Sequence, residues 1–146
     1  MKTSVTELPF NRLIGLQTAP TAEQLLLLPP GEQYANHLGT VHASALLALA
    51  EASSGEYLLR RFGTGTGVVP VVRRLEAKFR KPANGAVTSA ASATPEDLAR
   101  LDADLAAKGR ALVSIAVELH DASGVHALSA TVEWFIQKLP PNSISS

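Results

Sequence analysis

The chain has 146 residues, 46% of them hydrophobic and 18% charged, and this composition predicts one globular domain over 1–146 with a core of its own. Basic and acidic residues both number 13, and the resulting zero net charge argues against a protein that coats nucleic acid or an anionic membrane. There is no cysteine, which excludes disulfides, thiolate metal sites and a cysteine nucleophile. The leucine run at 25–28 is too short to span a bilayer, so we expect a soluble cytoplasmic protein.

The first half of the chain predicts two short strands, separate or paired as a hairpin, and one long helix. Apolar runs at 14–18 and 24–28 are the two expected strands, and a Pro-Pro-Gly sequence closes the second. The stretch 41–60 is rich in Ala and Leu, lacks proline and is apolar on nearly every face, which is typical of a helix surrounded by other elements. Gly63 is expected to end this helix in a left-handed cap.

The second half predicts four strands and one inserted helix. After the glycine-rich loop, alternating polar and apolar residues indicate a strand at 68–80 and a weaker one at 86–93. Thr94 and Pro95 begin a helix that Gly109 ends. Strands at 110–120 and 125–137 form a hairpin, and 140–146 resembles a flexible tail. This order favours an α+β fold with a mostly antiparallel sheet curled around the long helix.

The residues that point to chemistry surround the start of the long helix. Free backbone N–H groups at a helix N-terminus carry partial positive charge, so the Ala43 amide is suited to hold the oxyanion formed when a thioester carbonyl is attacked. Glu51 follows on the same apolar helix, either as part of this site or as an ordinary solvated helix residue. Apolar surroundings raise the pKa of a carboxylate, and a raised pKa suits a general base that activates water.

Helix geometry then predicts a dimer. Ala43 and Glu51 are eight residues apart in the sequence, so they lie about 12 Å apart along the helix axis. One chain cannot bring both groups to the same carbonyl. If they cooperate, a second copy of the chain must supply one of them, which gives two composite sites per dimer.

The motif Asn36-x-x-Gly39-x-x-His42, with Glu51 nine residues after the histidine, resembles the hotdog-fold thioesterases of the PaaI-like, phenylacetyl-CoA thioesterase type. The resemblance implies an antiparallel sheet wrapped around a long central helix, and hydrolysis of acyl-CoA without a metal or a cofactor beyond the coenzyme A of the substrate. It also implies a homodimer or a dimer of dimers with joined sheets. In this family's pattern Asn36 positions the water or the carbonyl, the Ala43 amide donates to the oxyanion, and Glu51 is base or nucleophile.

The chain departs from that family in four respects. Ala43-Ser44 replaces the usual Gly-Gly after the histidine, and Glu51 stands where an aspartate is common. The Ser or Thr that some relatives have where the next strand begins is missing around Val68-Val69. The helix expected at 95–108, inserted between two late strands, is longer than the usual turn.

Several of these residues have a purely structural alternative. Asn36 and Gly39 could simply make the turn into the helix. His42 is expected only to position the helix start. Because His37 and His42 are five residues apart with no cysteine or clustered acid nearby, no zinc site is expected. Ser54, at i+3 from Glu51, could hold the attacking water or be a packing residue.

A basic stretch at 60–81 is a candidate for binding coenzyme A. Its strand residues Arg73, Arg74 and Arg80 could bind the phosphates through bidentate guanidinium contacts, or line a solvated strand face.

Two other functions remain open. His37 and Glu51 resemble the proton-transferring pair of hotdog 3-hydroxyacyl dehydratases, although the Phe-Pro-Gly context of that family is missing. A non-catalytic acyl-CoA-binding module is the third hypothesis. No DNA-binding segment is visible, so no nucleic-acid partner is expected.

Overall fold

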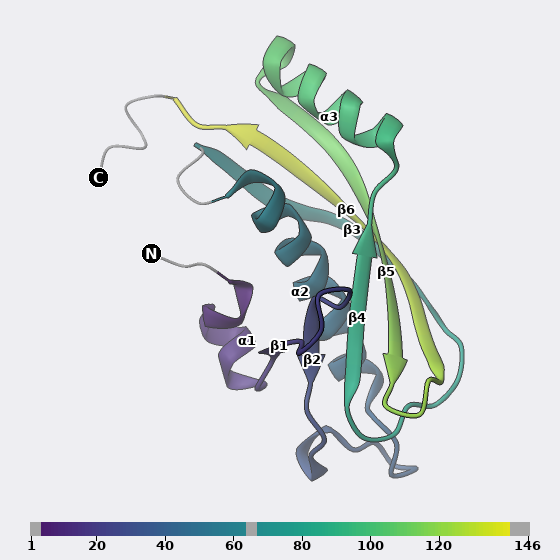
Figure 1. The fold of residues 1–146 in the computed structure, drawn as a ribbon. Coiled ribbons are helices and arrows are strands. Elements are labelled where there is room, and N and C mark those ends of the chain that lie inside the picture. Colours follow the sequence, from purple (N-terminus) through teal and green to yellow (C-terminus); the bar gives the residue numbers. More distant parts are fainter. Residues whose placement is uncertain (1–3, 64–66, 141–146) are drawn as a thin grey trace.

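A single curved antiparallel sheet wraps around the long helix α2 (Figure 1). The structure is a computed structural model that describes residues 4–63 and 67–140. In these residues the six strands are ordered β1-β2-β4-β5-β6-β3. They are β1 (Gln17–Thr18), β2 (Leu26–Leu28), β3 (Val68–Phe79), β4 (Val87–Ser92), β5 (Arg110–Asp121) and β6 (His126–Lys138). The helices are α1 (Pro9–Leu13), α2 (Ala43–Phe62) and α3 (Pro95–Lys108), with 3-10 turns η1 (Val5–Glu7) and η2 (Glu32–Tyr34).

The predicted α+β class and the predicted element order are confirmed. β1 and β2 pair as the expected hairpin, but β1 is only two residues long. The inserted helix forms as α3, between β4 and β5. Pro140 is the only described residue of the predicted tail, and 64–66 of the glycine-rich loop also lie outside the described residues. The N-terminal elements η1 and α1, and the turn η2, were not predicted.

Capping residues set the ends of both long helices. Thr94 accepts a hydrogen bond from the Asp97 amide at 3.0 Å, and Gly109 closes α3 with φ +73°. Gly63 ends α2 as predicted, with φ +76°, but its ψ of −174° lies outside the left-handed helical region that we expected.

No helix in the described part of the chain has both the length and the apolarity needed to cross a membrane.

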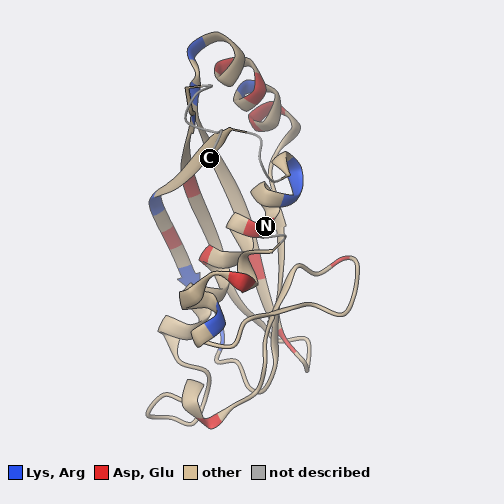
Figure 2. Ribbon diagram, turned by 90° about the vertical axis from the view of Figure 1, so that its left-hand side faces the viewer, with Lys and Arg blue, Asp and Glu red and all other residues tan. Residues whose placement is uncertain are grey.

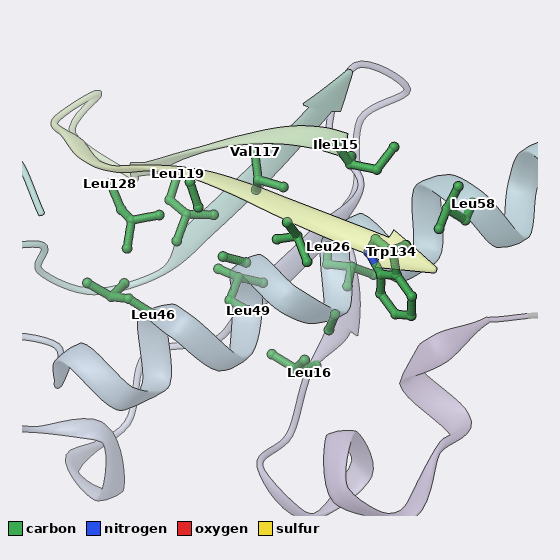
Figure 3. Packing of buried hydrophobic residues seen from close by; sticks show 14 of the residues in the cluster. Leu16, Leu26, Leu46, Leu49, Leu58, Ile115, Val117, Leu119, Leu128 and Trp134 are labelled. Atoms are coloured by element: carbon green, nitrogen blue, oxygen red, sulfur yellow. The ribbon is translucent and has the colours of Figure 1, made fainter. Parts of the chain in front are cut away.

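The two faces of the sheet differ in character. Along β5, residues 111, 113, 115, 117 and 119 are buried on the inner side of the sheet, while the alternate residues face outward and are partly or fully exposed. Leu46, Leu49 and Leu58 of α2 meet this inner face in the core (Figure 3). Burying each of these leucines contributes about 1.5–3 kcal/mol to the stability of the fold. We call the opposite side, which α2 does not cover, the outer face of the sheet.

The N-terminal segment is tied to α2 by polar contacts. The Glu56 carboxylate is only 2% exposed and accepts hydrogen bonds from the Ser4 hydroxyl at 3.2 Å and the Val5 amide at 3.0 Å. Its second oxygen pairs with Arg60 at 2.8 Å. A little further along, the Tyr34 hydroxyl donates to the backbone carbonyl that follows α1, at Ile14. These contacts hold η1 beside the second half of α2 and the end of α1 beside η2.

Buried hydroxyl groups join α2 to strands β2 and β4. Ser53 and Ser89 lie 2.6 Å apart between their hydroxyl oxygens, and the Leu26 amide donates to the Ser89 hydroxyl at 3.1 Å. Ser53 and Ser89 are at most 1% exposed. An interior donor that loses its acceptor costs the full desolvation of that group.

We therefore expect Ser89→Ala to lower the free energy of unfolding by about 1–3 kcal/mol, because it removes the acceptor of the Leu26 amide. Ser92→Ala, on the exposed end of the same strand, should change it by less than about 0.5 kcal/mol. Urea unfolding of both variants and of the wild type measures the difference. Equal stability of the two variants would contradict the structural role of Ser89.

Candidate active site

Asn36 and Gly39 build the turn that precedes α2. The Asn36 side chain accepts hydrogen bonds from the amides of Leu38 at 2.9 Å and Thr40 at 3.0 Å, and donates to the Thr40 hydroxyl at 2.8 Å. Gly39 has φ +80°, a conformation that glycine adopts most readily. In the single chain these contacts correspond to the structural alternative, in which Asn36 and Gly39 make the turn into the helix. The second N–H of the Asn36 side chain remains for a ligand.

His42 is the N-cap of α2. Its Nδ1 accepts a hydrogen bond from the Ser44 amide at 2.9 Å, and its own amide donates to the Tyr34 carbonyl at 2.7 Å. An acceptor Nδ1 is unprotonated, so the imidazole proton of the neutral ring lies on Nε2. These contacts make His42 the capping residue of α2.

The Ala43 amide is free at the start of the helix. Ala43 is the first helical residue and is exposed, and its N–H makes no hydrogen bond to any described residue. The other three of the first four N–H groups of α2 have partners, since those of Ser44, Ala45 and Leu46 donate to His42. The Ala43 N–H is thus open to an external anion or to a polarised carbonyl oxygen.

Glu51 lies two turns further along α2 and is half-buried. Burial raises the pKa of its carboxyl group above the usual value, as the apolar character of the helix predicts. Within the described residues its carboxylate has no hydrogen bond or ion pair, in contrast to Glu56, which has three partners. Of these two acids on α2, Glu51 is the one left free to take up a proton.

Ser54 is part of the core. It is fully buried, donates to the Glu51 backbone carbonyl at 2.7 Å and accepts from the Trp134 indole N–H at 2.9 Å. A hydroxyl used in this way is not open to a solvent water in the single chain, which corresponds to the packing alternative. The Trp134 bond was not foreseen, because the two residues are 80 positions apart in the sequence.

An apolar groove lies between α1 and the first turns of α2. It has a volume of about 460 Å³. The lining side chains are Phe10, Leu13, Ile14, Gln33, Tyr34, Ala35, His42, Ser44, Ala45 and Ala48. Phe10 and Leu13 are 61% and 82% exposed, so α1 presents large apolar side chains that no described part of the chain covers. The groove therefore begins beside the free Ala43 amide, at Ser44, and follows α2 toward Glu51.

Of the three arginines predicted to bind coenzyme A phosphates, Arg73 and Arg74 lie on β3 and Arg80 directly follows it, on the outer face of the sheet. Figure 2 shows basic and acidic positions alternating along this edge strand. Arg74 pairs with Glu76 at 2.5 Å, and Arg80 donates to the Ser129 hydroxyl at 2.7 Å. Arg73 lies over the Phe135 ring, 5.8 Å from its centre. The structure does not gather them into one site, and α2 is on the other side of the sheet.

A serine, a histidine and a glutamate also meet on the outer face. His126 Nε2 lies 2.7 Å from Glu118 and 3.2 Å from the Ser129 hydroxyl, which itself donates to Glu118 at 2.5 Å. A catalytic triad needs the acid and the serine on opposite nitrogens of the imidazole, and here both meet the same nitrogen.

Among the described residues no group of three or more His, Asp or Glu side chains is arranged to hold a metal ion.

Comparison with solved structures identifies this architecture as the hotdog fold. The protein PA5026 from Pseudomonas aeruginosa, described as a probable thioesterase, is 26% identical over 92% of this chain and 91% of its own, with a TM-score of 0.77. BH2602 from Bacillus halodurans, solved with CoA, is 18% identical over 87% and 74%, with a TM-score of 0.66. The thioesterase HI1161 from Haemophilus influenzae is 15% identical over 92% and 87%, with a TM-score of 0.67.

These neighbours confirm the resemblance to the hotdog-fold thioesterase superfamily, while the PaaI-like relationship stays a prediction. No curated protein matches the chain. The model of a family described as a domain of unknown function, DUF4442, matches residues 19–136, which is most of the sequence. The chain therefore belongs to the DUF4442 family.

Proposed function

We propose that the protein hydrolyses acyl-CoA thioesters, with Glu51 as general base and the Ala43 amide as oxyanion donor. The observation that carries this proposal is the state of Glu51, an acid on the central helix that is half-buried and has no partner in the described chain, with burial raising its pKa. No cofactor other than the coenzyme A of the substrate takes part.

The reaction balances with these groups. The Glu51 carboxylate takes a proton from water as the water oxygen bonds to the thioester carbon, and the Ala43 N–H stabilises the negative charge that develops on the carbonyl oxygen. When the tetrahedral intermediate collapses, the carbon–sulfur bond breaks. The leaving thiolate takes the proton from Glu51, which returns the carboxylate to its starting state.

The two groups come from different protomers in this proposal. Both lie on α2, eight residues apart, so the helix rise separates them by about 12 Å in one chain. A homodimer with two equivalent composite sites, alone or within a dimer of dimers, brings the Ala43 amide of one protomer to Glu51 of its partner.

The groove beside Ala43 suits the acyl group. Its walls are mainly apolar, and burial of an acyl chain against Phe10 and Leu13 would remove their exposed surface from water. Two relatives support the substrate class: one is described as a probable thioesterase, and another was solved with CoA. We also propose a cytoplasmic location, with which a chain lacking cysteine is compatible.

Thiol release from a panel of short, medium, long and aromatic acyl-CoAs tests the activity. We expect Glu51→Gln to lower kcat by about 10²–10⁴-fold, because it removes the base. Glu23→Gln, which changes an exposed loop carboxylate, should keep wild-type activity. If the wild type releases no thiol, a dehydratase assay with His37 and Glu51 variants and a binding assay decide between the two alternatives.

Mixed dimers test the composite site. Ala43→Pro removes the donor N–H at the first helical position, where proline fits well, and His42 already has the extended backbone, φ −64° and ψ 141°, that precedes proline. We expect Ala43→Pro and Glu51→Gln to be inactive alone. Mixed after unfolding and refolding, they should regain about a quarter of wild-type activity, because half the dimers are mixed and each has one intact site.

No recovery from the mixture, with mixed dimers shown by mass spectrometry, would mean that the two groups do not cooperate across the interface.

The raised pKa of Glu51 also predicts a stability effect. The folded state binds the proton more tightly than the unfolded chain, so this contribution to stability is present below the ordinary value of 4.5 and lost as the pH rises through the raised pKa. Glu51→Gln should therefore raise Tm at neutral pH and leave it unchanged near pH 4. The same Tm difference at both pH values would contradict the burial cost assigned to the ionised carboxylate.

A further inference from the structure

The outer face of the sheet contains a second pocket that the proposed reaction does not use. Its volume is about 480 Å³, which is within the usual range for small-molecule sites. The pocket is lined by residues of α3 and of strands β3, β5 and β6. α3 is the inserted helix, one of the respects in which this sequence departs from the family that it resembles.

Part of the floor of this pocket is apolar. Leu112 and Phe135 are neighbours across β5 and β6, and Leu112 is 44% exposed. Val71 is the next neighbour of Phe135, on β3, and is 53% exposed. A row of large apolar side chains thus crosses a face on which the adjacent row consists of Arg74, Glu133 and Ser114.

Two arginines flank this floor without a carboxylate partner among the described residues. Arg73 is the extra residue of an irregularity between Val72 and Arg74, and its guanidinium group lies 5.8 Å from the centre of the Phe135 ring. Arg110 opens β5 on the other side of Phe135, and its side chain makes no ion pair or hydrogen bond within the described chain. Both line the pocket.

The α3 wall adds charge that is already partly neutralised. Arg100 pairs with Asp97, and Lys108 lies 3.8 Å from Asp104. Figure 2 shows both signs of charge along this helix. The lining as a whole contains four basic residues and two acidic ones. With Arg100 and Lys108 paired, the charges left in the lining are those of Arg73, Arg110 and Glu133, so the pocket keeps a net positive charge.

We propose that this pocket binds a phosphorylated nucleoside. Guanidinium groups bind phosphate through paired, charge-assisted hydrogen bonds, and the planar base would pack on Leu112 and the Arg73–Phe135 pair. The nucleotide is either a free effector or the nucleotide end of coenzyme A, and only the second source rests on the proposed thioesterase function. The site is distinct from the groove beside Ala43, because the sheet separates it from α2.

Isothermal titration calorimetry with adenosine 3′,5′-bisphosphate tests the pocket, with uncharged adenosine as the comparison ligand. We expect Arg110→Gln and Arg73→Gln each to weaken bisphosphate binding by about tenfold or more. Lys78→Gln is the matched control. It removes a positive charge from β3, the strand of Arg73, but outside the pocket, and it should change the affinity by less than about twofold.

Absence of bisphosphate binding by the wild type, or binding that both arginine variants retain, would overturn the proposal. The titration needs no turnover, so its result tests the pocket even if the protein hydrolyses no thioester. A loss of activity in Glu51→Gln, in turn, says nothing about this pocket.

A second titration separates the two sources. CoA is added to protein saturated with the bisphosphate. Competition, together with weaker CoA binding by Arg110→Gln, assigns the pocket to the nucleotide end of coenzyme A. Binding of CoA alongside the bisphosphate assigns it to a free nucleotide.

Discussion

Helix α2 is apolar on almost every side, and the rest of the fold follows from the need to bury it. Its buried residues, among them Leu46, Leu49 and Leu58, point in several directions around the helix axis. One flat sheet cannot cover so wide a surface. The sheet therefore curves around the helix, and η1 and α1 cover part of the side that the strands leave open.

That arrangement also determines which part of α2 is left for chemistry. Ala43 and Ser44 are exposed, whereas Ala48 and Glu51 are half-buried, so the uncovered stripe runs from the helix start to the candidate base. Nothing in the described chain neutralises Glu51. A stripe of this kind is a surface on which a second protomer can place its own groups, as the proposed dimer requires.

The strands that alternate clearly and the helices with standard caps could be predicted, since these signals are local. Thr94 and Gly109 bound α3 because each satisfies free backbone groups next to it. α1 could not be predicted in this way, since five residues are too few to show a period, and its position depends on Glu56 and Tyr34. The irregularity at Arg73 likewise depends on how β3 pairs with β6, which the sequence of β3 does not reveal.

For the candidate site, the sequence by itself determined that Glu51 lies on an apolar helix and that Ala43 cannot reach the same carbonyl within one chain, because the rise of a helix per residue is constant. Tertiary structure decided how fully each acid of that helix is satisfied. Glu56 has a local partner in Arg60, four residues on, which Glu51 lacks, but its burial and its two further hydrogen bonds come from the N-terminal segment, and no segment of the described chain supplies such bonds to Glu51. The protonation behaviour of a carboxylate depends on what packs around it, and those neighbours come from distant parts of the chain.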